Sequence, residues 1–373
     1  MKTRICHIST VHSRYDTRIF EKECCSLAKA GFEVFFVVAD GMDNEEHSGV
    51  NIVSACEKYS SRLDRMRKAT RKAYEKVLEI NPQVCHIHDP ELLTIAIKLQ
   101  KKGFKVIFDS HEFTAIQLRE ARAYIPKCLR SMVSFLYRKY ELYVTKRISG
   151  VIIPCLRRGE DYFSGKYKDM ELINNVPIIS RIVTPQEQIE KKSNATCYVG
   201  SITKERGIVN TIKASYQAGC ELYLIGLMAD ELRAELETMP EYQCVRYLGK
   251  LRMEEFSRIV SQCNVGLCLL QKLGQHDEGD NLSTKIYEYM AMGIPVVVSD
   301  MRMNKQIVEE KQCGICVNPD NVDEIAEAIR SIIEDSEKAD TMAQNGARLA
   351  RECFCWEEEE KKLLRFYKKV IYG

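Results

Sequence analysis

The feature that most constrains the fold of this chain is an alternation, repeated in both halves, of short apolar runs with segments of helical periodicity. The runs of the first half are RICHIST, EVFFVVAD, VCHIHD, KVIFDSHE and GVIIPC, and those of the second half are ATCYVGSI, ELYLIG, CVRYLGKL, NVGLCLL, PVVVSD and GICVNP. Runs of this length are typical of buried strands, and strands that alternate with helices form parallel sheets covered on both faces. The pattern therefore predicts an α/β chain with two doubly wound domains.

The expected domain boundaries follow from the break between the two series of runs. We predict an N-terminal domain at residues 1–175 and a C-terminal domain at residues 195–354. Residues 176–194 contain prolines and end in a charged stretch with few apolar residues, which is typical of a linker. A helix at about 355–373 follows, and we expect it to pack back on the N-terminal domain.

The composition indicates a soluble globular protein. The chain is 45% hydrophobic and 29% charged, and no stretch approaches the roughly 20 apolar residues of a membrane span. The start, MKTRICHIST, leads directly into a predicted strand without an apolar signal core. We therefore expect a cytoplasmic protein whose 16 cysteines are mostly reduced and buried. The C-x-x-C spacing of Cys313 and Cys316 lies between a helix end and a strand, which argues against a redox site.

The charge is distributed unevenly along the chain. The first 175 residues carry about eight more basic than acidic side chains, and the remainder about six more acidic than basic ones. Basic and apolar residues alternate at near-helical spacing in residues 62–76 and 129–147. This pattern fits either ordinary amphipathic helices packed on a sheet or reversible docking at the anionic inner face of the cell membrane. We expect no nucleic-acid partner.

Two polar loops in the second half carry candidate ligand-binding residues. In GSITKERGI, Gly200 lets the backbone approach a ligand closely, and Arg206 follows at a position suited to a diphosphate. In DNLSTKIYE, Lys285 falls in the first turn of a helix, with Ser283 or Thr284 as its N-cap, and Glu288 lies one turn further on. The alternatives are a simple tight turn at the first loop and a solvated surface lysine at the second.

In the first half, polar side chains follow two predicted strands. His88 and His111 stand at carboxyl ends of strands, where ligands bind in open parallel sheets. A metal site is the alternative, but no compact third ligand at standard spacing accompanies them, so we expect none. Asp16 lies in the loop after the first strand, where helix capping is the alternative to ligand binding.

The segments YDTRIFEKECCSLAKAGFEV, VCHIHDPELL, KVIFDSHE, YVGSITKERGI and LSTKIYEYMAMGIPVVVSD, in this order, resemble the retaining nucleotide-sugar glycosyltransferases of family 4. The resemblance implies the GT-B fold, in which two Rossmann-like domains face each other across a cleft. Its most specific element is the paired acidic motif E-x7-E, with Asp280 as the first acid and Glu288 as the second.

The resemblance also implies roles for individual residues. Glu288 would bind the nucleotide ribose, and Arg206 and Lys285 would hold the donor diphosphate. His111 matches the active-site histidine beside the donor sugar. Gly200 and Ser201 would also contact the donor diphosphate. The donor sugar would be held by Asp280, Asn281, Leu282, Ser283 and Thr284, and Asp280 would also be catalytic. The residues implied on the acceptor side are Asp16, His88, Asp89 and Glu112. Ser201 departs from the family, which often has an arginine there, and HSRYDTR replaces the usual glycine-rich N-terminal loop.

The function implied by the resemblance is transfer of a hexosyl group from a nucleotide-sugar to a hydroxyl of a glycan or polyprenyl-linked glycan, for a surface polysaccharide. We expect no cofactor and no metal requirement. Two alternatives stay open: a nucleotide-sugar epimerase of the same fold, and a catalytically silent partner that binds sugar nucleotides.

Overall fold

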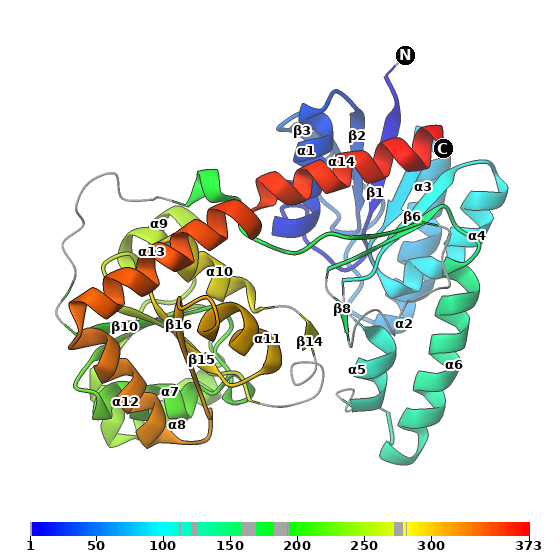
Figure 1. Cartoon of the computed structure of the whole chain (residues 1–373). Helices are drawn as coiled ribbons and strands as arrows, with labels where there is room; N and C mark the ends of the chain where they lie inside the picture. The colour runs from blue at the N-terminus through cyan, green and yellow to red at the C-terminus, as the bar shows by residue number, and fades with distance from the viewer. Residues whose placement is uncertain are drawn as a thin grey trace. The chain divides into compact units, whose positions relative to one another are not determined.

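The computed structural model describes the chain except residues 1, 112, 121–124, 155, 158–168, 183–191, 193, 272–278 and 281, and gives only the backbone of residues 120, 156–157 and 279–280. The described residues form two compact units (Figure 1). Unit 1 comprises Met1–Asn175 and Glu359–Gly373, and unit 2 comprises Val176–Glu358. Val176 and Ile182 are buried in the core of unit 2.

Unit 1 is built on a sheet with the strand order β3-β4-β2-β1-β5-β6-β7-β9. The pairings are parallel except that between β3 and β4, as expected for strands joined by helical crossovers. The order reverses between β1 and β5, so the carboxyl ends of these two strands form the ligand-binding position typical of such sheets. The strands are β1 (Arg4–Ile8), β2 (Glu33–Val38), β3 (Glu45–His47), β4 (Val50–Ser54), β5 (Val84–Ile87), β6 (Lys105–Asp109), β7 (Gly150–Ile153), β8 (Leu156–Arg157) and β9 (Met170–Leu172).

The helical segments of unit 1 connect these strands. Two of them, η1 and η2, are π-helical. At the start of η1 the Asp16 carboxylate accepts hydrogen bonds from the backbone N–H groups of Arg18 and Ile19. The segments are η1 (Thr17–Cys24), α1 (Cys25–Lys29), α2 (Arg62–Asp64), η2 (Arg65–Ala69), α3 (Thr70–Ile80), η3 (Pro90–Leu92), α4 (Leu93–Lys101), α5 (Thr114–Glu120) and α6 (Lys127–Thr145).

Unit 2 repeats the scheme with a parallel sheet in the order β12-β11-β10-β13-β15-β16. Here the order reverses between β10 and β13. The strands are β10 (Ala195–Val199), β11 (Glu221–Ile225), β12 (Val245–Tyr247), β13 (Val265–Cys268), β14 (Gly279–Asp280), β15 (Val296–Ser299) and β16 (Gly314–Val317). Both predicted parallel sheets are thus confirmed.

The helical segments of unit 2 cover both faces of its sheet, with one apolar cluster on each side. They are η4 (Ile179–Arg181), η5 (Lys204–Arg206), α7 (Ile208–Gln217), α8 (Asp230–Glu237), η6 (Pro240–Cys244), α9 (Met253–Val260), α10 (Thr284–Ala291), α11 (Arg302–Asn304), η8 (Lys305–Glu309), α12 (Val322–Ile333) and α13 (Ser336–Cys353).

The last helix, α14 (Trp356–Tyr372), supplies core side chains to unit 1 from residue 359 onward. Leu363, Phe366 and Tyr367 are buried there. Gly150 at the start of β7 makes room for Phe366, because a Cβ on Gly150 would lie 2.6 Å from the Phe366 Cζ atom. The sequence of unit 1 is therefore discontinuous, and its C-terminal helix completes the core.

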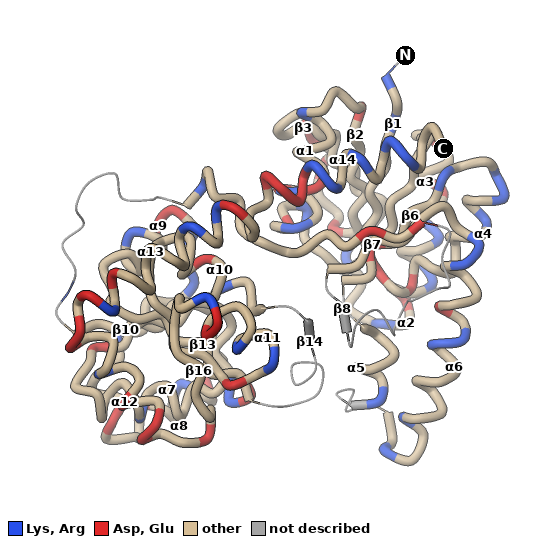
Figure 2. Tube along the Cα trace, in the orientation of Figure 1, with Lys and Arg blue, Asp and Glu red and all other residues tan. Residues whose placement is uncertain are grey.

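The described helices include none that is both long and apolar enough to cross a membrane. Lys and Arg residues are frequent along α3, α4 and α6 of unit 1 (Figure 2). Helix α6 also exposes large apolar side chains, namely Leu129, Met132, Phe135, Leu136, Tyr140 and Tyr143.

Candidate active site

The loop between β10 and α7 lies at the reversal point of the unit 2 sheet. Gly200 follows β10 with φ at +121°, and Gly207 precedes α7 with φ at +73°. A Cβ on Gly207 would lie 2.0 Å from the Leu269 carbonyl oxygen, so only glycine fits there. The two glycines hold residues 200–207 close to the carboxyl ends of β10 and β13, with Ser201 exposed and Arg206 half-buried.

Lys285 lies beside this loop and is the most unusual side chain of unit 2. It is only 5% exposed, and its Nζ atom makes no hydrogen bond to any described residue. The ammonium group lies 3.6 Å from the centroid of the Tyr198 ring. A Cβ on Gly200 would stand 3.2 Å from Nζ, so the glycine leaves the space that the lysine uses. The alternative of a solvated surface lysine is wrong.

The pKa of Lys285 is lowered to about 8, mainly by burial. The positive Arg206 contributes to this lowering, whereas Cys268 and Glu288 act in the opposite direction. A buried cation that contacts an aromatic ring but no hydrogen-bond acceptor is costly unless an anion arrives. Lys285 and Arg206 therefore form a basic pair that can bind an anionic ligand.

Tyrosines hold the strand and the helix of this site together. The Tyr289 hydroxyl of α10 accepts a hydrogen bond from the Val199 backbone N–H at the end of β10, at 2.8 Å. The Tyr198 hydroxyl donates to the Ser201 carbonyl at 2.8 Å. The first contact holds α10 against the end of β10. The second ties the Ser201 backbone to Tyr198, whose ring contacts the Lys285 ammonium group.

Helix α10 begins and ends close to the positions expected from the sequence. Ser283 is the N-cap residue, although its side chain makes no capping hydrogen bond, and Gly293 follows the helix with φ at +67°. Thr284 and Glu288 are half-buried, and Leu282 is buried with its N–H directed at the Tyr287 hydroxyl. The side chain of Asp280 and the whole of Asn281 lie outside the described residues.

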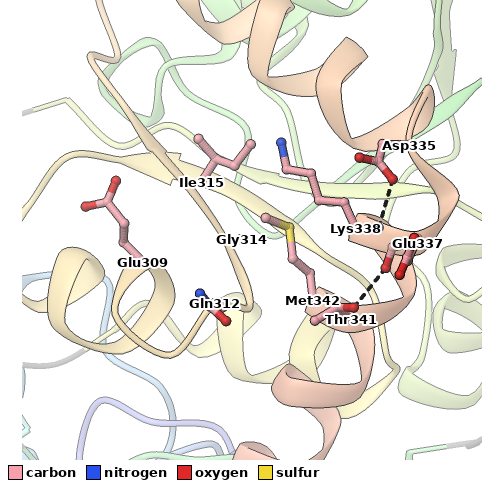
Figure 3. A pocket seen from close by; sticks show the side chains of 9 residues that line it. All are labelled: Glu309, Gln312, Gly314, Ile315, Asp335, Glu337, Lys338, Thr341 and Met342. Atoms are coloured by element: carbon pink, nitrogen blue, oxygen red, sulfur yellow. Dashed lines mark hydrogen bonds between the residues drawn. The ribbon is translucent and has the colours of Figure 1, made fainter.

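A cavity of unit 2 lies away from this loop. It measures about 550 Å³ and is lined by residues from η8, the start of β16 and the start of α13 (Figure 3). Gly314, the first residue of β16, stands at the amino end of its strand, and Glu309, Asp335 and Glu337 contribute carboxylates. An acidic cavity at the amino edge of a parallel sheet does not suit a diphosphate, so the site at Gly200 and Lys285 is the better candidate.

In unit 1, His111 follows β6 and is partly exposed. Its Nε2 atom lies 3.2 Å from Asp109 Oδ2 and 3.0 Å from His88 Nδ1. Arg18 donates two hydrogen bonds to the Asp109 carboxylate, at 2.9 and 3.1 Å. Although burial opposes ionisation, the Arg18 guanidinium and the histidines hold the pKa of Asp109 well below its usual range. A carboxylate in this position orients the imidazole of His111.

Two residues expected on the acceptor side are buried instead. His88 lies behind His111 and also contacts His7, with 2.9 Å between His88 Nε2 and His7 Nδ1. Asp89 accepts a hydrogen bond from Ser9 and lies 3.1 Å from His12 Nδ1. Because neither side chain is accessible, both position their neighbours and do not contact an acceptor in this arrangement.

Asp16, another residue expected on the acceptor side, caps η1 through hydrogen bonds to the Arg18 and Ile19 backbone N–H groups, both at 2.9 Å. This is the structural role named as its alternative. Glu112 lies outside the described residues.

Several residues of unit 1 that join this network did not stand out in the sequence. His7 lies inside β1 and His86 inside β5. Both have apolar neighbours in the sequence, so the pattern indicated only a buried strand at each position. Tyr367 is some 280 residues away from His86, yet its hydroxyl lies 2.7 Å from His86 Nδ1. The signal available for His86 was the H-x-H spacing with His88, which places both side chains on one face of the sheet.

Comparison with known proteins identifies the chemistry of unit 2. Residues 181–349 match the family model described as Glycosyl transferases group 1. The chain is 25% identical to spore coat protein SA of Bacillus subtilis over 126 residues, which is 34% of this chain and 32% of that protein. It is 21% identical to the uncharacterized glycosyltransferase MJ1069 of Methanocaldococcus jannaschii over 295 residues, which is 74% of this chain and 71% of that protein.

Solved structures establish the fold. Sucrose-phosphate synthase from Thermosynechococcus elongatus superposes with a TM-score of 0.80 at 17% identity, covering 99% of both chains. The Anabaena protein Alr3699/HepE, solved with UDP-glucose, gives a TM-score of 0.70 at 16% identity, covering 98% of this chain and 99% of that one.

The fold is GT-B, and residues 181–349 form a glycosyltransferase domain. The predicted GT-B fold and the predicted enzyme class are therefore confirmed. The basic pair of this glycosyltransferase, Arg206 and Lys285, lies within the matched segment.

Proposed function

We propose that this glycosyltransferase belongs to the retaining enzymes of family 4 and transfers a hexosyl group from a nucleotide-sugar to a hydroxyl of a glycan. The observation that carries the proposal is the buried Lys285 ammonium, which makes no hydrogen bond within the described part of the chain and lies beside Gly200 and Arg206. An enclosed cation without an acceptor is suited to a ligand that brings its own negative charge, and a donor diphosphate supplies it.

In the proposed reaction, the acceptor oxygen forms a bond to the anomeric carbon while the bond from that carbon to the diphosphate oxygen breaks on the same face. The acceptor proton passes to the departing phosphate oxygen, and a nucleoside diphosphate is released. Negative charge on the leaving oxygen grows as the bond breaks, so the cations of Lys285 and Arg206 stabilise the transition state more than the bound donor. The step requires neither a metal ion at the diphosphate nor a protein nucleophile.

The proposed contacts of the sugar and the ribose follow the resemblance described above. Glu288, one turn beyond Lys285 in α10, would accept hydrogen bonds from the ribose hydroxyls. Asp280 and the segment through Thr284 would hold the donor sugar. By the same resemblance, we propose that the imidazole of His111, oriented by Asp109, contacts a hydroxyl group of the donor sugar.

The acceptor is proposed to be a polyprenyl-linked glycan at the inner face of the cell membrane, in synthesis of a surface polysaccharide. Support comes from α6, which exposes a row of large apolar side chains next to Lys139 and Arg147. Such a helix suits the interface of an anionic bilayer, because apolar side chains enter the acyl boundary while basic ones meet the headgroups. The likeness to a spore coat protein points in the same direction.

The donor is tested by a thermal-shift screen with UDP-, GDP- and ADP-sugars. We expect one nucleotide class to raise Tm in wild type, because ligand that binds only the native state stabilises it. UDP-sugars are the first candidates, since the neighbour Alr3699/HepE was solved with UDP-glucose. No shift with any nucleotide-sugar at millimolar concentration would contradict the proposed donor site.

The activity is tested by incubating the purified protein with the donor identified in this screen. A glycosyltransferase releases nucleoside diphosphate slowly alone and faster with a lipid-linked glycan acceptor. A nucleotide-sugar epimerase would convert the sugar without any acceptor, and a silent partner would bind donor without any turnover. Either of the last two results would overturn the proposed transfer.

A further inference from the structure

Unit 1 contains a buried cluster of three histidines and one glutamate, here called the His3Glu cluster: His7, His86, His88 and Glu23. Parallel strands β1 and β5 supply the histidines, with His7 and His86 directly opposite in the strand register and His88 just beyond β5. Glu23 comes from η1, and its carboxyl group lies beside His7 and His86. The four side chains are at most 1% exposed.

The distances within the cluster are those of a metal-ion site. One ligand atom from each of the four residues can be chosen so that all lie within 4.8 Å of one another. His7 Nδ1 is 2.9 Å from His88 Nε2, and Glu23 Oε2 is 3.8 Å from both His7 Nδ1 and His86 Nδ1. Ligands of a tetrahedral zinc ion lie about 2.1 Å from the metal, hence about 3.4 Å from each other. The distances of 2.9 and 3.8 Å differ from this value by about half an ångström.

Three polar atoms of the cluster lack hydrogen-bond partners among the described residues. Neither oxygen of Glu23 accepts a hydrogen bond from a described residue, and His86 Nε2 has no partner there either. The nearest cation to Glu23 is Arg18, whose Nε lies 3.3 Å from Oε1 but donates its hydrogen bond to Asp109. A buried carboxyl group without hydrogen-bond partners is costly, and a metal ion would remove this cost.

The surroundings orient the imidazoles as metal ligands. With His7 Nδ1 directed into the cluster, its Nε2–H can donate to the Tyr367 hydroxyl at 3.1 Å. With His88 Nε2 directed inward, its Nδ1–H faces the Asp109 carboxylate at 3.6 Å and His111 Nε2 at 3.0 Å. Metal-bound histidines commonly donate their second N–H to such carboxylate or hydroxyl oxygens.

We propose that the His3Glu cluster binds one divalent transition-metal ion, with Zn²⁺ as the best match for three imidazole nitrogens and one carboxylate oxygen. A second set, His88, Asp109 and His111, is also within 4.8 Å. It is less suitable because Arg18 already neutralises Asp109 through two hydrogen bonds. The proposed ion has a structural role: it fixes His88, which contacts His111, and it takes no part in sugar transfer.

This inference goes beyond the proposed function and departs from the expectation of a metal-free protein. The sequence showed only two histidines at strand ends and no third ligand at standard spacing. The fold supplies the other ligands from β1, β5 and η1, so the ligand set is not visible as a local motif.

The first experiment measures the metal content of the untagged wild-type protein purified from cells grown with added zinc. We expect about one zinc ion per chain by elemental analysis. Unfolding and refolding with a chelator should remove the ion and lower Tm, and Zn²⁺ added during refolding should restore it. A wild-type protein that holds no stoichiometric metal, and whose Tm after refolding does not respond to Zn²⁺, would overturn the proposal.

The second experiment identifies the ligands by refolding the wild-type protein with Co²⁺. Tetrahedral Co²⁺ bound by imidazole and carboxylate gives visible d–d absorption without a thiolate charge-transfer band. A thiolate band would place the metal on cysteines such as the buried pair Cys6 and Cys85 and would exclude the cluster. A d–d spectrum without a thiolate band would support binding of the metal ion by the His3Glu cluster.

Variants provide the matched comparison. Glu23→Gln keeps the size of the side chain but removes the anionic ligand, and we expect the affinity for zinc to fall about tenfold or more. His47→Ala removes an exposed histidine on β3 and should leave metal content and Tm unchanged. Unaltered zinc affinity in Glu23→Gln would contradict the assignment. If this variant fails to fold, the cobalt spectrum of wild type decides.

The Tm shift with nucleotide-sugars reports on unit 2 separately, so failure of the metal site and failure of the proposed donor site are distinguishable.

Discussion

At the scale of single residues, the buried Lys285 provides a test of the proposed sugar transfer. Replacing it with alanine removes a charge-assisted contact worth roughly 1.5 to 3 kcal/mol, which corresponds to a loss in rate of roughly 10- to 100-fold. Because the diphosphate gains charge during transfer, we expect Lys285→Ala to lower kcat more than donor affinity. Steady-state kinetics with saturating donor measures this difference. Glu288→Gln is the matched comparison and should weaken nucleotide binding instead, since the ribose does not change during reaction. Wild-type kcat in a correctly folded Lys285→Ala variant would refute the diphosphate assignment.

The lowered pKa of Lys285 predicts a pH dependence of donor binding. In the free protein the ammonium loses its proton as the pH rises through about 8, whereas a bound diphosphate stabilises the charged form. Donor affinity should therefore fall above pH 8, approaching tenfold per pH unit, and binding should take up a proton. Titration calorimetry in two buffers of different ionisation enthalpy detects this proton. Lys285→Met should abolish the uptake, and proton uptake that persists in Lys285→Met would assign it to another group.

The same pKa shift affects stability with a definite sign. Between about pH 8 and 10.5 the unfolded chain binds the Lys285 proton and the folded chain does not. The contribution of Lys285 to the free energy of unfolding therefore rises with pH across this window. At pH 7 the buried ammonium destabilises the ligand-free protein, which is consistent with a site that is completed by its anion.

His111 provides a second test at the residue scale. If its imidazole contacts only the donor sugar, His111→Ala should lower turnover and leave the affinity for the bare nucleotide nearly unchanged. Binding of nucleoside diphosphate by calorimetry, beside kinetics with the full donor, separates the two effects. An equal loss of both would show that His111 has a structural role.

At the scale of elements, α6 provides a test of the proposed docking on a bilayer. Phe135 and Leu136 are among its most exposed apolar side chains. We expect co-sedimentation with anionic vesicles at low salt, a weaker association with neutral vesicles, and loss of binding in Phe135→Ser/Leu136→Ser. Leu227→Ser, which alters a similarly exposed leucine in unit 2, should bind like wild type. Equal partition of wild type to neutral and anionic vesicles would argue against docking.

The contact between β7 and α14 gives a prediction about packing. A Cβ on Gly150 would overlap the buried Phe366 ring, so Gly150→Ala should lower the free energy of unfolding by about 1 to 3 kcal/mol. Chemical denaturation measures the loss. Phe366→Leu removes ring atoms from the same place, and the double variant should lose less than the sum of the single changes. Strict additivity would show that the two positions do not interact.

At the scale of the whole molecule, unit 1 depends on a segment that is distant in sequence. Leu363, Phe366, Tyr367 and Val370 are buried, and each such side chain contributes about 1.5 to 3 kcal/mol. Their total is comparable with the whole stability of a typical domain. A chain that ends at residue 358 should therefore lose the unfolding transition of unit 1 in urea. A truncated chain with two wild-type transitions would contradict this.

The sequence by itself determined most strands of the two sheets, because apolar periodicity and turn residues act over a few positions, but the short strands β3, β4 and β9 were not predicted. It also indicated Gly200, Arg206, Lys285 and Glu288, since loops that follow successive strands of a parallel sheet meet at one edge. The helix at Thr284–Ala291 and the glycine after it were predictable for the same local reason.

Only the tertiary structure decided which of these groups are buried and what they contact. The sequence left Lys285 open between a surface residue and an anion ligand, because its burial depends on Tyr198 and Gly200, some 85 residues earlier. It placed His88 at an accessible strand end, whereas the fold buries it between His7 and His111. The fold brings together Glu23 from η1, His86 from β5 and Tyr367 from α14. No local sequence pattern predicts contacts between residues so far apart in the chain. Burial and long-range contact are properties of the packed chain, so they appeared only when the elements were assembled.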